Sequence, residues 1–222
     1  MHVEPLQVPA GSGQTFGPFK HAAIIYREQS ASKELFTLDF SAEGKIERKP
    51  PARLEKYAWA VPAAILPPMR RQVAHLCDYI ANHNHKFPYG IKDSDASVFI
   101  PDGSSVALGT GCIGFTCATF VLAVFRRFGI YLLDAANWVH RDADRAWQKS
   151  IADLQAAIGT PAYIVAANRA DAAVGCFRFR PEEVVAAAML SCERVTFADA
   201  SRLGQTVAGW AEILAAIVGR RP

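Results

Sequence analysis

The chain has 222 residues, of which 51% are hydrophobic and 20% charged, and its formal net charge at pH 7 is +3. This composition is typical of a globular protein, and the scattered Lys and Arg residues make nucleic acid an unexpected partner. No apolar run approaches the roughly 20 residues of a membrane span, so stable membrane insertion is not expected. The 5 cysteines are odd in number and lack paired spacing, which indicates a reduced, cytoplasmic protein.

The first part of the chain predicts an antiparallel sheet. Residues 9–18 are rich in Gly and Pro, so regular structure is expected to begin near Phe19. Four runs have strand character: His21–Glu28, Glu34–Phe40, Lys45–Lys49 and Tyr57–Val61. The polar residues 29–33 predict a hairpin between the first two runs, and the last two are expected to continue the meander.

Helices follow the predicted sheet and dominate the last third of the chain. Five segments have helical spacing of apolar residues: Met69–Ala81, Thr116–Phe128, Asp142–Ile158, Pro181–Leu190 and Gln205–Val218. Short strands are expected at Ala162–Ala166 and Phe177–Phe179. The pattern predicts an α+β fold, with a core over residues 1–135 and a helix-rich extension over residues 136–222 that packs on the same domain.

Cys117 is the candidate nucleophile. It stands at the start of the predicted helix Thr116–Phe128, where free N–H groups favour a thiolate, and Gly114 permits close backbone approach. Cys117 also heads an apolar stripe on this helix, and a buried cysteine often acts as a small core residue. The helix is expected to end at Gly129, in the position of a left-handed cap.

These residues resemble a known family. The patterns Cys117-x-x-Phe120-Val121 and His21-x-Ala23-Ile24-x-Tyr26 are similar to those of the circularly permuted NlpC-type branch of the papain-like superfamily. This branch includes lecithin:retinol acyltransferase-like proteins and related bacterial cysteine hydrolases. In it, a histidine on the first sheet strand precedes the nucleophilic cysteine, which is the order found here.

The resemblance implies a papain-like antiparallel sheet packed against the nucleophile helix. It implies that Cys117 attacks an amide or ester bond, that His21 serves as general base and acid, and that a thioester forms without a cofactor. Acyltransferase-like members carry Asn before the cysteine and Glu-His after it, whereas this chain has Thr116, Ala118 and Thr119. The sequence therefore favours a hydrolase acting on a peptide, a cell-wall fragment or a lipid conjugate.

A third residue, which the family takes from the second strand, is expected to orient His21. A hairpin centred on Ala31 places Asp39 diagonally beside His21, and a carboxylate would stabilise the imidazolium, so Asp39 is preferred. Thr37 on the same strand face is the second choice. The simpler alternatives are that Asp39 is a solvated charge at a strand edge and that His21 is a surface or capping residue.

Other polar groups give weaker indications of the chemistry than Cys117 and His21. The oxyanion hole is expected to use the N–H of Cys117 with an unassigned second donor. Cys112 in a Gly-rich loop is an alternative nucleophile or resolving thiol. No metal is expected: His75, Cys77, His83 and His85 have suitable side chains, but helical positions 75 and 77 point about 200° apart.

Two alternative functions remain open. One is a non-catalytic binding module on a papain-like fold, which would bury Cys117 away from His21. The other is a membrane-associated acyltransferase, which would need an apolar anchor or a basic amphipathic face.

Overall fold

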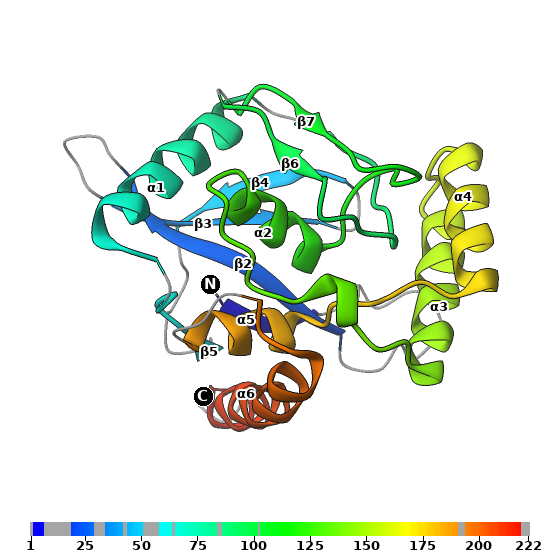
Figure 1. The fold of residues 1–222 in the computed structure, drawn as a ribbon. Helices are drawn as coiled ribbons and strands as arrows, with labels where there is room; N and C mark the ends of the chain where they lie inside the picture. Colours follow the sequence, from blue (N-terminus) through cyan, green and yellow to red (C-terminus); the bar gives the residue numbers. More distant parts are fainter. Residues whose placement is uncertain are drawn as a thin grey trace.

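The computed structural model describes residues 2–6, 19–28, 34–41, 44–50, 58–63, 65–83, 86–101, 103–190 and 194–218. Within these residues it combines helices with two antiparallel sheets, which agrees with the α+β class predicted from the sequence (Figure 1).

The larger sheet has five antiparallel strands in the order β4-β3-β2-β1-β5. Their bounds are β1 His2–Leu6, β2 Phe19–Arg27, β3 Leu35–Phe40, β4 Ile46–Lys49 and β5 Ala58–Trp59. The strand that carries His21 is therefore the central one.

The β2–β3 hairpin has the predicted register. Ile24 lies opposite Leu38 and Tyr26 opposite Phe36, as a turn centred on Ala31 requires. The apolar residues of both strands consequently face one side of the sheet.

Two expectations about the sheet were wrong. The first strand lies at His2–Leu6, before Phe19. The sequence pattern did not predict it because it contains Pro5, and proline is unusual within a strand. The run at Tyr57–Val61 does not continue the meander beyond β4. Its strand residues, Ala58–Trp59, pair with β1 at the opposite edge of the sheet. Pairing order between distant strands is decided by the whole fold and leaves no local pattern.

A second, smaller sheet pairs two strands that the sequence pattern missed. These are β6 (Val98–Phe99) and β7 (Val106–Ala107), each two residues long. Alternation cannot be recognised over two residues.

The helices match four of the predicted segments closely. Their bounds are α1 Pro67–Asn82, α2 Cys117–Arg126, α3 Asp142–Ala157, α4 Ala162–Val174, α5 Pro181–Met189 and α6 Phe197–Val218, with a short 3-10 turn at Ala135–Asn137. Helix α6 begins at Phe197 rather than Gln205. The hydroxyl of Thr196 accepts a hydrogen bond from the N–H of Asp199 at 3.3 Å and caps this earlier start.

The strand predicted at Ala162–Ala166 is instead the first part of α4. Its β-branched residues Ile164 and Val165 are buried, and a short apolar run fits a helix as well as a strand. The strand predicted at Phe177–Phe179 was also wrong, because these residues join α4 to α5 without pairing in a sheet.

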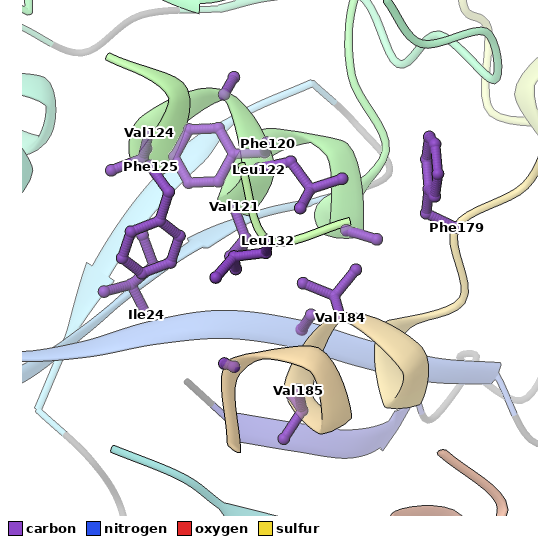
Figure 2. Packing of buried hydrophobic residues seen from close by; sticks show 14 of the residues in the cluster. Ile24, Phe120, Val121, Leu122, Val124, Phe125, Leu132, Phe179, Val184 and Val185 are labelled. Carbon is purple, nitrogen blue, oxygen red and sulfur yellow. The ribbon is translucent and has the colours of Figure 1, made fainter. Parts of the chain in front are cut away.

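One hydrophobic cluster links the sheet to helices from both parts of the chain. It contains Ala22, Ile24 and Leu38 of the sheet together with residues of α2 and α5 (Figure 2). The ring of Phe120 on α2 stacks on that of Phe40 with centroids 5.6 Å apart. Each fully buried Phe contributes about 1.5–3 kcal/mol by leaving water, so this cluster holds α2 against the sheet.

Candidate functional site

Helix α2 begins at Cys117 because Thr116 caps it. The hydroxyl of Thr116 accepts from the N–H of Thr119 at 3.2 Å, and the hydroxyl of Thr119 accepts from the N–H of Thr116 at 2.7 Å. This reciprocal pair satisfies two N–H groups that the helix leaves without internal partners. The thiol is thereby fixed on the first residue of the helix, as predicted.

The segment before α2 is held by a close contact between two loops. The N–H of Phe115 donates to the carbonyl of Pro88 at 3.2 Å, and that of Gly90 donates to the carbonyl of Phe115 at 3.1 Å. A Cβ on Gly114 would lie 1.7 Å from the Pro88 oxygen, so only glycine fits there. Gly114 thus permits the close approach that the sequence suggested.

The Cys117 side chain is buried, with 6% of its surface exposed. Burial raises the pKa of the thiol to about 11. Hydrogen bonding by the backbone of Ala22 and of Ala118, and the positive charge of Arg178, act in the opposite direction. The thiol is therefore protonated at neutral pH, although its surroundings include groups that stabilise a thiolate.

His21 is buried on β2, next to Ala22. Burial and, to a smaller extent, the charge of Lys49 lower the pKa of its imidazole to about 4, and the charge of Glu47 partly offsets them. The ring is neutral at pH 7 and is available as a proton acceptor.

The two candidate orienting residues lie on the same strand face as His21. Side chains alternate along a strand, and Ala22 and Ile24 belong to the core shared with α2, so His21 falls on the opposite face. Asp39 and Thr37 share that face on β3. The Asp39 carboxylate lies 3.8 Å from the Lys49 ammonium, and the Thr37 hydroxyl donates to the Lys49 carbonyl at 3.2 Å.

The site residues are thus divided between two surroundings. His21, Thr37 and Asp39 gather around Lys49, whereas Cys117 contacts the β2 backbone at Ala22. Among the residues that the structure describes, no hydrogen bond joins the Cys117 sulfur to the His21 ring. Asp39 belongs to the group around Lys49, and it also lies near enough to Cys117 for its charge to raise the pKa of the thiol.

Tyr89 is a site residue that the sequence pattern missed. Burial raises the pKa of its hydroxyl, and the backbone N–H of Cys117 lies near enough to that hydroxyl to act in the opposite direction. The Tyr89 carbonyl accepts from the side-chain amides of Asn168 at 2.7 Å and Gln155 at 2.9 Å. Helices α3 and α4 therefore hold Tyr89 against the start of α2, a contact that no local pattern reveals.

Arg178 is the second residue that was missed. It lies between α4 and α5, its guanidinium is 3.7 Å from the centre of the Trp147 ring, and its charge acts on both Cys117 and Tyr89. The sequence predicted a strand at Phe177–Phe179, and this prediction gave Arg178 no part in the site.

The other cysteines have different surroundings. Cys77, Cys112, Cys117 and Cys176 are all free thiols. Burial raises the pKa of Cys112, and its position in the loop Gly109–Gly114, outside any helix start, gives it no N-terminal helix groups. Cys117 remains the better placed thiol.

Within the described ranges, no three His, Cys, Asp or Glu side chains are grouped so that they could hold a metal ion. His85, one of the four metal-type side chains noted in the sequence, lies outside those ranges. No helix in the same ranges has the length and apolar character needed to cross a membrane. Comparison with protein-family models, curated proteins and solved structures found no match.

Proposed function

We propose that the protein is a cysteine hydrolase that cleaves an amide or ester bond through a thioester on Cys117. The observation that carries this proposal is the placement of the thiol. Cys117 heads a capped, buried helix, and backbone groups of Ala22 and Ala118 together with the charge of Arg178 favour its thiolate.

The proposed fold is the papain-like one, in its permuted NlpC-type form. Two features support it: the cysteine-bearing helix α2 packs on an antiparallel sheet, and the histidine lies on the central strand and precedes the cysteine in the chain.

In the proposed mechanism, neutral His21 accepts the thiol proton and the sulfur attacks the substrate carbonyl carbon. The resulting oxyanion receives hydrogen bonds from the Cys117 N–H and the Tyr89 hydroxyl, which lie side by side. The leaving group departs with a proton from His21, and water then hydrolyses the thioester. Asp39 and Thr37 keep their proposed roles as groups that orient the imidazole.

The proton has to travel between two faces of β2. The mechanism therefore includes a local rearrangement of the β2 backbone around His21 that brings the ring to the face of Cys117, since catalytic hydrogen bonds often form only when substrate is bound.

Alkylation by iodoacetamide at pH 7, followed for each cysteine by mass spectrometry, tests the proposed pair. We expect Cys117→Ala to abolish labelling at this position and His21→Ala to slow labelling of Cys117 about tenfold or more. His75→Ala, on the exposed face of α1, is the matched control and leaves the rate unchanged. If neither Cys117→Ala nor His21→Ala slows modification of the most reactive thiol, the proposed pair does not exist.

A non-catalytic binding module is the second candidate. The 6% exposure of Cys117 and its raised pKa favour this alternative. In that case Cys117 stays unlabelled in the folded protein and reacts only after denaturation.

A further inference from the structure

The segment that joins α4 to α5 contacts another part of the candidate site. The Cys176 thiol donates to the Ile91 carbonyl at 3.6 Å, which places this segment next to the loop of Tyr89. The carbonyl of Arg178 accepts from the indole N–H of Trp138 at 3.1 Å and from the guanidinium of Arg141 at 2.9 Å. These two hydrogen bonds fix the backbone of Arg178.

The Arg178 guanidinium belongs to an ion-pair cluster in which three arginines donate to the Asp144 carboxylate. Asp144 accepts from Arg141 at 2.7 Å, from Arg180 at 2.9 Å and from Arg178 at 3.3 Å, so Arg178 has the longest of these contacts. A guanidinium has five N–H donors. Within the part of the chain that the structure describes, the guanidinium of Arg178 donates to Asp144 alone.

The same guanidinium is mostly buried but remains accessible to solvent. It stacks on the Trp147 ring at 3.7 Å, and 16% of the side chain is exposed. Arginine keeps its charge at all ordinary pH values, and this charge is compensated only in part, through a 3.3 Å ion pair with Asp144 and the charge of Glu182. Its charge acts on Cys117 and on the Tyr89 hydroxyl that faces the Cys117 N–H.

We propose that Arg178 binds a carboxylate of the substrate. The substrate class is then an amide or ester with an acidic group close to the bond that Cys117 attacks. A carboxylate matches the paired N–H donors that the guanidinium leaves open. This inference rests on the proposed function of Cys117 and assigns the specificity of that site to the C-terminal part of the chain.

Two alkylating agents of nearly equal size test the inference. Iodoacetate carries a carboxylate and iodoacetamide is its neutral analogue. With either agent the Cys117 sulfur forms a bond to carbon, the carbon–iodine bond breaks, iodide leaves with the electron pair, and the thiol proton passes to solvent. The measured quantity is the ratio of the two labelling rates at Cys117, relative to the same ratio for glutathione.

In the wild-type protein we expect a ratio roughly tenfold above that of glutathione. Arg178→Gln lowers it to the glutathione value, whereas Arg178→Lys retains part of the preference. Arg180→Gln is the matched control, since Arg180 also binds Asp144, whereas Arg178 is the arginine whose charge acts on Cys117. The ratio in this control stays at the wild-type value.

The outcomes separate the two proposals. A wild-type ratio equal to that of glutathione, or a ratio unchanged by Arg178→Gln, overturns the role of Arg178 while leaving Cys117 a reactive thiol. Failure of both agents to label Cys117 in the folded protein overturns the proposed function itself. If circular dichroism shows that Arg178→Gln does not fold, wild-type labelling at rising salt decides: selective slowing of iodoacetate supports the inference, and equal rates overturn it.

Discussion

The backbone of Ala22 lies near enough to the thiol of Cys117 to lower its pKa, which places the first residue of α2 against the central strand of the sheet. The neighbouring residue, His21, turns to the other face of that strand. The thiol and the imidazole thus lie at neighbouring positions along β2 but on opposite faces of the sheet.

The reactivity of Cys117 should rise steeply with pH. Its pKa of about 11 means that the thiolate fraction, and hence the alkylation rate, grows about tenfold per pH unit from pH 7 to about 10. Rates measured at Cys117 in a pH series check this. Glutathione is the control and levels off near pH 9, whereas a plateau at the same pH for Cys117 would contradict the burial described here.

Stability should fall in mild acid because of His21. Its folded pKa is about 4 against 6.5 for the unfolded chain, so the unfolded state binds more protons between these values. The contribution of neutral His21 is complete above pH 6.5 and is lost as the pH falls towards 4, by about 3 kcal/mol in total.

Urea unfolding at several pH values measures this loss. His21→Asn removes that part of the pH dependence, while His75→Asn, an exposed position, retains it. An identical acid loss in the two variants would assign the effect to other groups.

Gly114→Ala should destabilise the protein strongly. The new methyl group would meet the Pro88 oxygen at 1.7 Å and force the two loops apart, at a cost of more than about 2 kcal/mol. Gly209→Ala is the control, because its Cβ meets nothing within 4 Å on helix α6. There alanine should stabilise by about 0.5–1 kcal/mol. Thermal unfolding of both variants tests the contrast, and equal melting temperatures would refute it.

Asp93→Ala should cost about 3–5 kcal/mol, because it leaves the buried Arg126 guanidinium without its main partner. Arg126 donates to both Asp93 oxygens, at 3.1 and 2.6 Å, and both side chains are 4% exposed. The matched variant Asp153→Ala breaks an exposed pair with Arg169 and should cost under about 1 kcal/mol. Chemical denaturation compares the two losses, and similar values would show that Asp93 is not essential to the fold.

The hairpin and helix α2 could be predicted because their signals are local. Alternation in Glu34–Phe40 and a polar turn around Ala31 were enough to give the register of β2 and β3. Thr116 marks the start of α2, and Gly129, with φ of 72°, follows its end at Arg126 by three residues, so these two residues were enough to bound the helix closely. In each case neighbours in sequence determine the conformation.

The rest of the site depends on contacts between distant segments. Tyr89 is placed by amides on α3 and α4, and Arg178 by Trp138, Arg141 and Asp144, none of which is close in sequence. Sequence pattern also ranked Asp39 by its register with His21, and could not indicate that Lys49 joins the same group. Charge pairing of this kind becomes visible only when the strands are assembled.

The position of the connecting segment at Arg178 has a consequence for synthesis. Ribosomes make the histidine and the thiol before the helices that fix Tyr89 and before Arg178, and α6, which contacts β1, follows them. A nascent chain that ends before Arg178 would carry an incomplete site. The order of translation thus delays assembly of the candidate site until the segment at Arg178 has left the exit tunnel.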